Sequence, residues 1–377
     1  MKFMLSFIFV VVSGFAFSQS IDISNYYDTI CDCYKDLPYG PEQEWHLLDF
    51  YKANTDERTT IVIFAHGAGS NKDVIRLHPF IKAYVLDSCL DNDISVASVE
   101  FRHPVEDTSL SAPATDIARV VQFFRYYHED LNIDTMNVFL AGTSRGTLAI
   151  WTAVQDDLAD PVNDDPILRK SSRVNGVWAV QGQTSYNSEW IVETFFHPAI
   201  WQFFQPYYNL GHAIGDVTPD DPPMILNYKD SLVPLPVMDT NVDLIHLPNF
   251  GYFFEEEYIV DGIGDRVEVN YNIIDTMLYY GFIDFVRANS YPETIENISA
   301  AKNILLYPNP ADENVYIKTQ DVMIEKVKIL DINGRVLKEI FADRTGLVID
   351  ISYLPPGLYI LKILAKDSFY CRKLLVN

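Results

Sequence analysis

Continuous apolar runs alternate with amphipathic stretches along most of the chain. The runs at residues 59–65 and 94–101 are typical of strands that are buried on both faces. Residues 112–130 carry apolar side chains at helical spacing on one face. Further strands are indicated at 44–51, 136–142, 174–180, 224–228 and 266–271, and further helices at 73–86, 147–154 and 274–288. Such alternation predicts an α/β fold with a doubly wound, mostly parallel sheet that binds ligands at the carboxyl ends of its strands.

The pattern changes after residue 290. A short polar linker spans residues 291–303, and beyond it the helical period disappears. Short strands separated by turns are indicated at 315–317, 325–331, 335–340, 348–351, 357–363 and 372–376. Asn333-Gly334 is a hairpin signal between two of them. We therefore expect a small all-β sandwich over residues 304–377, after an α/β domain over residues 19–290.

Composition and charge narrow the classes of partner. The 377 residues allow two or three domains, and a formal net charge of −24 means that the surface repels phosphate. We expect no nucleic acid partner. Residues 1–18 have the features of a signal peptide: Lys2, an apolar core at 4–12 and a small-x-small site at 16–18. No later apolar stretch is long enough to predict a transmembrane span.

Cysteines and acidic residues give weaker signals. The four cysteines are Cys31, Cys33, Cys89 and Cys371, and in an oxidising compartment one bridge from Cys31 or Cys33 to Cys89 is possible. The acidic stretch at 156–165 lacks the spacing and the glycine of an EF-hand, which favours a solvated loop over a calcium site. We expect no metal and no cofactor.

Residues 142–146 read Gly-Thr-Ser-Arg-Gly and separate an apolar run from a helix-forming segment. A serine on such a sharp strand-to-helix turn projects its hydroxyl from the sheet, and the glycines avoid a clash of Cβ atoms. The backbone N–H of Arg145 would lie at the start of the helix, where it can stabilise an oxyanion. The pattern makes Ser144 a candidate nucleophile, with a structural serine in a glycine-rich turn as the alternative.

Four motifs occur in a fixed order between residues 45 and 288. They are His-Gly-Ala-Gly at 66–69, Phe-Arg-His-Pro at 101–104, Asp116, and the turn at 142–146. Together they resemble the α/β-hydrolase fold of the esterase- and lipase-like carboxyl-ester hydrolases.

The resemblance assigns roles to several residues. It implies that Ser144 is the nucleophile, and that backbone N–H groups of Arg145 and of Ala68 or Gly67 form the oxyanion hole. His66 is then a structural histidine at the end of a strand. An aromatic-rich insertion at about 184–223 would form a cap that shapes an apolar acyl or aryl pocket.

The rest of the triad departs from the family pattern. Such an enzyme needs an acid and then a histidine after the serine. Asp230 follows the strand at 224–228 and resembles the acid. No histidine follows the strand at 266–271. If residues 242–247 form the last strand instead, Tyr252 stands where the histidine belongs.

His246 and His212 remain as bases that reach in from an unusual place, and we prefer His246, downstream of Asp230. A histidine between apolar residues is also compatible with a purely structural role. Without a base, a serine hydroxyl is a poor nucleophile. Two hypotheses follow: a serine hydrolase of carboxylic esters, or a catalytically degenerate protein that binds a ligand at the surface. The expected ester is a small molecule or is linked to a polysaccharide.

The C-terminal module closely resembles the sorting domain of the type IX secretion system. The matching segments are 306–310 (Leu-Tyr-Pro-Asn-Pro), 327–336, 354–359 and 373–376. The resemblance implies the type IX secretion machinery as a partner and a secreted or cell-surface location. A carbohydrate-binding module is the competing hypothesis, although the sequence reveals no exposed aromatic platform for it.

Overall fold

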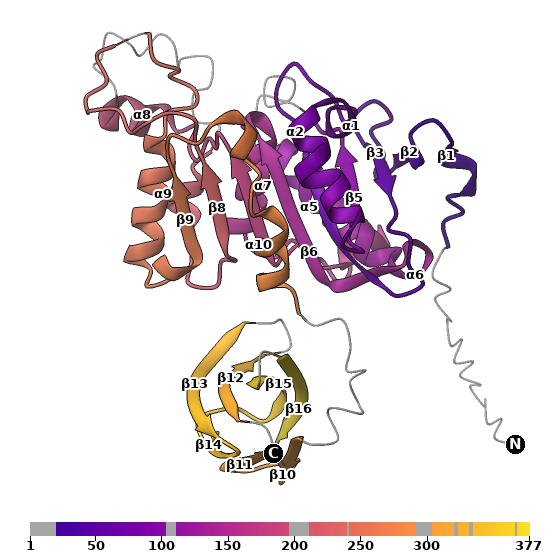
Figure 1. The fold of residues 1–377 in the computed structure, drawn as a ribbon, viewed down its shortest axis with the longest axis vertical. Coiled ribbons are helices and arrows are strands. Elements are labelled where there is room, and N and C mark those ends of the chain that lie inside the picture. Colours follow the sequence, from indigo (N-terminus) through magenta and orange to yellow (C-terminus); the bar gives the residue numbers. More distant parts are fainter. Residues whose placement is uncertain are drawn as a thin grey trace, which may run out of the picture.

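The computed structural model describes residues 20–102, 111–195, 211–239, 241–291, 304–319, 323–331, 335–365 and 368–377. The expected signal peptide, most of the expected linker and residues 196–210 of the expected cap lie outside these ranges. Figure 1 shows an α/β domain followed by a smaller β-module.

A nine-stranded sheet runs through the α/β domain. Its strands are β1 (Tyr27–Asp28), β2 (Cys33–Pro38), β3 (Leu47–Tyr51), β4 (Thr59–Ala65), β5 (Ser95–Val99), β6 (Ile133–Thr143), β7 (Gly176–Val180), β8 (Met224–Asn227) and β9 (Val267–Asn270). In space they follow the order β1-β2-β3-β5-β4-β6-β7-β8-β9. The six strands from β5 to β9 are parallel, whereas β1, β2 and β3 pair antiparallel. The prediction of a mostly parallel α/β sheet is confirmed.

Helices cover both faces of this sheet (Figure 1). They are α1 (Val74–Leu77), α2 (Pro79–Ile81), a π-helical turn (Lys82–Asp87), α3 (Ser88–Leu90), α5 (Ser111–Tyr126), α6 (His128–Leu131), α7 (Leu148–Val154), α8 (Ser188–Thr194), α9 (Asn249–Val260) and α10 (Phe282–Asn289). The buried side chains of α1 to α3 and α10 form one core, and those of α5, α7 and α9 form the other. Along β4, Val62 and Phe64 face the first core while Ile61 and Ile63 face the second. Burial on both faces explains the uninterrupted apolar run of this strand.

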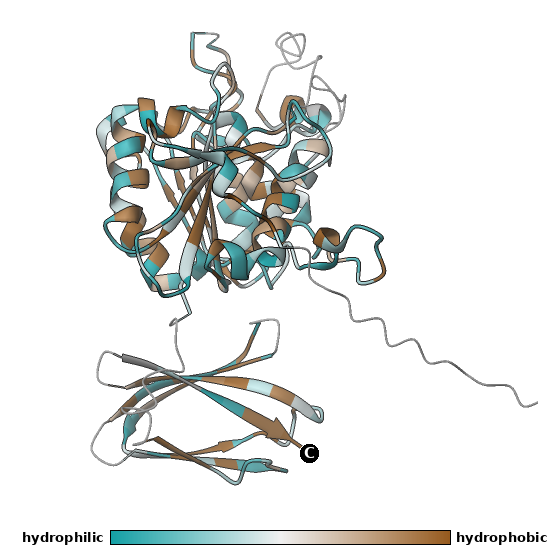
Figure 2. Ribbon diagram, turned by 90° about the vertical axis from the view of Figure 1, so that its right-hand side faces the viewer, coloured by the Kyte–Doolittle hydropathy of each residue, from teal (hydrophilic) through white to brown (hydrophobic). Residues whose placement is uncertain are grey.

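The C-terminal module is an antiparallel sandwich of two sheets. One contains β10 (Ile304–Tyr307), β11 (Asn314–Thr319) and β14 (Gly346–Asp350), and the other contains β13 (Val336–Arg344), β12 (Ile324–Leu330), β15 (Gly357–Ala365) and β16 (Ser368–Val376). Buried and exposed positions alternate along β11, and every second residue of β15 from Tyr359 to Ala365 is buried. Figure 2 shows the strands of the module in two layers. The inward side chains form a core of their own. The expected sandwich is confirmed.

Several local expectations were wrong. Residues 242–247 form no strand and instead lead into α9, which the sequence analysis missed. The helix expected at 274–288 begins only at Phe282, because residues 275–277 form a 3-10 turn and Gly281 adopts a left-handed φ of 85°. Glycine adopts this φ without the steric cost that a Cβ would bring, so the chain can change direction at Gly281 before the helix starts.

The disulfide differs from the expected one. Cys31 is bonded to Cys33, across a turn in which Asp32 has a φ of 51°. Cys89 is free and fully buried on α3. The tight turn brings the two neighbouring thiols together, so the bridge to Cys89 is not formed.

Candidate active site

The turn between β6 and η3 (Ser144–Thr147) holds Ser144 in an unusual backbone conformation. Its φ is 51°, in the left-handed region that side chains other than glycine rarely adopt. A Cβ added to Gly142 would lie 2.3 Å from Gly146 O, and one added to Gly146 would lie 1.8 Å from Ala65 O. Both positions therefore require glycine, since backbone packs directly on backbone. The result is a sharp elbow with a partly exposed Ser144 at its tip.

The loop after β4 flanks this serine. A Cβ added to Gly67 would lie 3.4 Å from Thr143 O and 3.6 Å from the Cβ of Ser144. Ala68 follows in the same loop and is exposed. The expected oxyanion residues Gly67, Ala68 and Arg145 thus lie on two chain segments that meet at Ser144.

The structure brings His246 to the serine. The distance from Ser144 Oγ to His246 Nε2 is 2.8 Å, although 102 residues separate them in the chain. His246 lies in the irregular segment between β8 and α9, rather than after the last strand of the sheet. The preferred candidate of the sequence analysis is therefore within hydrogen-bond reach of the hydroxyl.

The acid beside this imidazole is Asp243 and not Asp230. Asp243 Oδ2 accepts a hydrogen bond from His246 Nδ1 at 2.6 Å, three residues away on the same segment. Burial alone would raise the pKa of Asp243, but the bonds from the imidazole and from nearby backbone N–H groups outweigh it and lower the pKa. Asp230 is exposed, and its backbone carbonyl accepts from Asn272 at the end of β9. Asp243 was not among the predicted site residues, because the resemblance places the acid after the strand at 224–228, although the Asp-x-x-His spacing of this pair is visible in the sequence.

The other two candidates lie elsewhere. His212 Nδ1 forms a hydrogen bond with Ser185 Oγ at 2.8 Å, and desolvation lowers the pKa of this histidine. Trp190 packs against the His212 ring at 5.0 Å between centroids. Tyr252 is exposed on α9, because the register that would have placed it at the site does not form. Neither contacts the hydroxyl of Ser144 in the described structure.

Two features anchor the segment that carries His246 and Asp243. The side chain of Asn249 is buried, and its Oδ1 and Nδ2 bond to the backbone N–H and carbonyl of Val233, both at 3.0 Å. The second feature is a small apolar core formed by Ile191, Phe195, Val237, Leu247 and Phe250. It joins this segment to α8, the described part of the expected cap.

Asp116, the third of the four motifs, holds the chain segment that contains Arg102. It is buried on α5, accepts a hydrogen bond from His46 Nε2 at 3.0 Å, and accepts two or more from Arg102. Arg102 follows Phe101, whose ring lies under the guanidinium of Arg145 at 4.9 Å. Asp116 therefore has a structural role in fixing the chain that passes under the elbow.

The described ranges show neither a cluster of metal ligands nor a helix that could span a membrane. No group of three or more His, Cys, Asp or Glu side chains there is arranged to hold a metal ion. In the stretch at 156–165, Asp160 accepts bonds from Val162 N–H and from Asn163 Nδ2, which is typical of a self-contained loop. No helix in these ranges has both the length and the apolar character needed to cross a bilayer.

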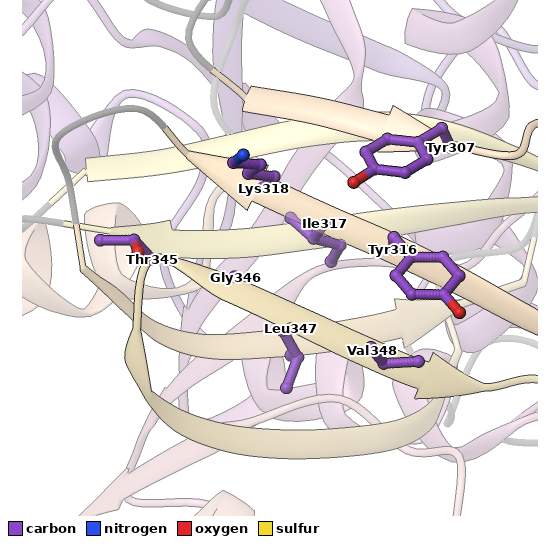
Figure 3. A pocket seen from close by; sticks show the side chains of 8 residues that line it. All are labelled: Tyr307, Tyr316, Ile317, Lys318, Thr345, Gly346, Leu347 and Val348. Carbon is purple, nitrogen blue, oxygen red and sulfur yellow. The ribbon is translucent and has the colours of Figure 1, made fainter.

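A shallow pocket of about 220 Å³ lies on the three-stranded sheet of the C-terminal module (Figure 3). Tyr307 and Tyr316 stack in it with ring centroids 5.6 Å apart, and both are partly exposed. The aromatic pair was not evident from the sequence, where the two residues lie on separate strands. The pocket is smaller than most small-molecule sites, which span roughly 300–1,000 Å³.

Comparisons with known proteins agree with this architecture. Residues 305–377 match a family model described as a secretion system C-terminal sorting domain, and residues 48–189 match one described as BD-FAE. Esterase 2 of Thermogutta terrifontis, phosphonylated by sarin, aligns over 68% of this chain and 95% of its own, with 15% identity and a TM-score of 0.50.

Two further solved structures align at a slightly lower TM-score of 0.49. A truncated carbohydrate esterase from gut microbiota shares 16% identity over 71% of this chain and 98% of its own. A bifunctional GH43-CE protein of Bacteroides eggerthii shares 18% identity over 69% of this chain and 38% of its own. No curated protein matches the chain.

The chain thus combines two recognised modules. The first is an esterase-like domain with the α/β-hydrolase fold. The second is a type IX secretion sorting domain, which directs the protein to the cell surface or the extracellular space. The expected fold, resemblance and location are confirmed.

Proposed function

We propose that the protein is a serine hydrolase of carboxylic esters, with Ser144 as the nucleophile, His246 as the general base and Asp243 as the acid that orients it. The observation that carries the proposal is the 2.8 Å separation of Ser144 Oγ and His246 Nε2 at a strained elbow. A nucleophile beside a base, with the base held by a third group, is the arrangement that activates a serine hydroxyl.

The proposed reaction proceeds in two halves. The Ser144 hydroxyl attacks the ester carbonyl carbon while its proton passes to His246 Nε2. The negative charge that develops on the carbonyl oxygen would be stabilised by backbone N–H groups of Gly67 or Ala68 and of Arg145. His246 then protonates the departing alkoxide, which leaves an acyl group on Ser144. In the second half, a water molecule attacks the acyl carbon while its proton passes to His246 Nε2. The bond from that carbon to Ser144 Oγ then breaks, the carboxylic acid leaves, and Oγ takes the proton back from His246.

The charges around the imidazole support this cycle. His246 becomes an imidazolium in each half-reaction, and Asp243 carries the opposite charge 2.6 Å from its Nδ1. The lowered pKa of Asp243 keeps that carboxylate ionised through the mildly acidic range. The Nδ1 proton donated to Asp243 leaves Nε2 free to accept the proton of the serine.

The surface near the base favours an apolar substrate group. Leu235, Met238 and Ile245 lie on the segment that carries His246, and these residues are 42%, 64% and 45% exposed, respectively. Trp190 and Phe195 pack at the base of the expected cap, with ring centroids 5.1 Å apart. We infer that the ester carries an apolar acyl or alcohol group and that the strongly acidic protein disfavours anionic substrates.

A fluorophosphonate probe tests the proposal directly. We expect covalent labelling of Ser144 in the wild type, located by peptide mass spectrometry, and none in Ser144→Ala. Ser185→Ala is the matched control, because Ser185 also bonds to a histidine but is fully buried and has no strained φ. The wild type and Ser185→Ala should also hydrolyse p-nitrophenyl acetate, and Ser144→Ala should not. A folded wild type that is neither labelled nor active would favour the ligand-binding hypothesis instead.

A further inference from the structure

One carboxylate fastens both ends of the loop that flanks Ser144. Glu100 directly follows β5, and its Oε2 accepts a hydrogen bond from His66 Nε2 at 2.9 Å. Its Oε1 accepts a bond from the backbone N–H of Lys72 at 2.8 Å. His66 and Lys72 bound the loop of residues 66–72, which contains Gly67 and Ala68. Glu100 therefore bridges the two ends of the loop, and Ser98 Oγ, which donates to the Lys72 carbonyl at 2.7 Å, also holds the Lys72 end.

The sheet holds Glu100 in place. Ala65 of β4 pairs with Val99 of β5, so the next residue of each strand, His66 and Glu100, leaves the sheet at the same level. The hydroxyl of Tyr39 donates to the Glu100 carbonyl at 2.6 Å, and the Glu100 N–H donates to the carbonyl of Leu47 at 2.9 Å. The carboxylate thus extends from a backbone that is fixed on both sides.

The His66 ring fixes the plane of the next peptide. Its Nδ1 lies 2.9 Å from the carbonyl oxygen of Gly67, which can only accept a hydrogen bond. The C=O of Gly67 and the N–H of Ala68 belong to one planar trans peptide, and they point in opposite directions. Because the carbonyl is bonded to the imidazole, the Ala68 N–H is turned away from it. The ring itself is fully buried.

Each ring nitrogen of His66 lies within hydrogen-bond distance of an oxygen, Nδ1 of the Gly67 carbonyl and Nε2 of the Glu100 carboxylate. Burial would raise the pKa of Glu100, but hydrogen bonds from His66 and from the Lys72 N–H outweigh it and lower the pKa. Glu100 is therefore the acceptor and not the donor. The other charged groups here are the Arg145 guanidinium, 3.4 Å from each ring nitrogen, and the Lys72 ammonium, which bonds to two aspartates.

We propose that Glu100 and His66 are positioning residues that hold the Ala68 N–H in the direction needed to stabilise the oxyanion at Ser144. Neither residue touches the substrate. The inference rests on the proposed function and deepens it, because it names the groups outside the triad on which the rate depends. An oxyanion donor acts only if it is aimed before the charge develops, and a misplacement of about 1 Å can cost roughly a hundredfold in rate.

The test replaces Glu100 and follows both rate and loop order. Glu100→Gln has one acceptor oxygen and cannot accept both bonds. We expect kcat for p-nitrophenyl acetate to fall about a hundredfold with KM within about twofold of the wild type, since the oxyanion forms only in the transition state. Amide hydrogen exchange in residues 66–72 should become roughly tenfold faster as the loop loses its charged hydrogen bonds.

Two further variants make the result interpretable. Glu57→Gln removes the same charge from an exposed side chain near the opposite end of β4, and it should change neither readout. Glu100→Asp keeps the charge but is one methylene shorter, so it can hold only one end of the loop. Its kcat and exchange rate should fall between those of the wild type and Glu100→Gln, and it keeps the test readable if the amide variant does not fold.

The outcomes separate this inference from the proposed function. Unchanged exchange in residues 66–72 of Glu100→Gln would show that Glu100 does not hold the two ends of the loop together (the Glu100 clamp), whatever the activity. Faster exchange without a fall in kcat would overturn the positioning role. A wild type that neither hydrolyses esters nor reacts with the fluorophosphonate would defeat the proposed function, and the oxyanion role with it, even if exchange showed that the clamp exists.

Discussion

Asp243 contacts the imidazole of His246 from three residues earlier in the chain, and about half of its side chain is exposed. At an effective dielectric between that of water and that of the protein surface, a pair of charges at their separation of 2.6 Å is worth about 2–6 kcal/mol. Burial of the triad acid would place the effect near or above the upper end of this range. The exposed Asp243 should therefore orient and stabilise the imidazolium less strongly than a buried acid.

This geometry predicts different effects for two aspartates. Asp243→Asn should lower kcat for p-nitrophenyl acetate by about a hundredfold, less than the roughly 10⁴-fold loss known for a buried triad acid. Asp230→Asn should stay within about twofold of the wild type, since Asp230 is exposed and joins the β9 end through its backbone. Steady-state kinetics of both variants decide the matter. A larger loss of kcat in Asp230→Asn than in Asp243→Asn would restore Asp230 as the acid.

Asp221 has a pKa raised to about 6, chiefly by burial, and its side chain is fully buried. The unfolded chain has an ordinary carboxyl value near 3.8, so between these two values the folded state binds more protons. The free energy of unfolding should therefore fall as the pH rises from about 4 to about 6, by at most about 3 kcal/mol.

Melting temperatures from pH 4 to pH 8 test this assignment. Asp221→Asn removes the titration, so its Tm should decline less than that of the wild type between pH 4 and pH 6. Asp220→Asn is the matched control, because Asp220 also contacts Arg173 but has a lowered pKa. Parallel pH profiles of Asp221→Asn and the wild type would refute the role of Asp221.

At the scale of elements, the irregular segment between β8 and α9 carries both His246 and Asp243, so its anchoring should control the reaction. Asn249 bonds to the backbone of Val233 through both side-chain atoms. We expect Asn249→Ala to lower the free energy of unfolding by about 1–3 kcal/mol, because it leaves buried backbone groups unpaired. It should also lower kcat roughly tenfold, as the base samples other positions.

Asn241→Ala provides the control for this prediction. Asn241 lies on the same segment but is exposed, and its side chain bonds only locally, to Asp239. Chemical denaturation and steady-state kinetics of both variants give the two quantities. If Asn249→Ala lost stability but kept its kcat, the segment would be held at the site by other contacts, such as the apolar core around Leu247.

The elements that the sequence predicted well are those with a strong local pattern. The buried strands β4 and β5 are marked by apolar runs. The elbow at Ser144 is marked by glycines, which are needed there because backbone packs directly against backbone. Helix α9 was missed although Phe250, Phe254 and Tyr258 are buried at helical spacing, because an acidic run and aromatic residues of both faces obscured the pattern. The resemblance to known hydrolases also directed attention to the loop after the last strand.

The site could be predicted only in part for a related reason. Ser144 and its flanking glycines form one local motif, whereas His246 reaches the serine through tertiary packing over 102 residues. The clamp of Glu100 on His66 depends on the register between β4 and β5, and no sequence spacing records that register. The Asp243–His246 pair was the exception, since an acid three residues before a histidine is visible in the sequence.

At the scale of the whole molecule, the chain contains separate hydrophobic cores. The α/β domain has its cores on the two faces of the sheet, and the sorting module has a core with no residue in common with them. In the described ranges, Lys362 of the module bonds to the carbonyl of Ser290 at 3.4 Å and lies 5.1 Å from the Tyr291 ring, both at the end of the α/β domain. Because these cores are separate, we expect the two modules to fold and unfold independently.

Export is the property that should respond to the sorting module alone. Leu361→Asp places a charge in the core of the sandwich, where the leucine is fully buried, and should unfold the module because an unpaired buried charge costs several kcal/mol. Leu358→Asp, on the same strand but 43% exposed, is the control.

In a host with type IX secretion, we expect Leu361→Asp to remain inside the cell while Leu358→Asp reaches the surface or the medium. Esterase activity per folded α/β domain should be equal in the two, because Ser144 and His246 lie in the α/β domain, whose cores share no residue with that of the module. Export of the Leu361→Asp protein at the control level would mean that the machinery does not read the folded sandwich, and loss of its activity would mean that the modules are coupled.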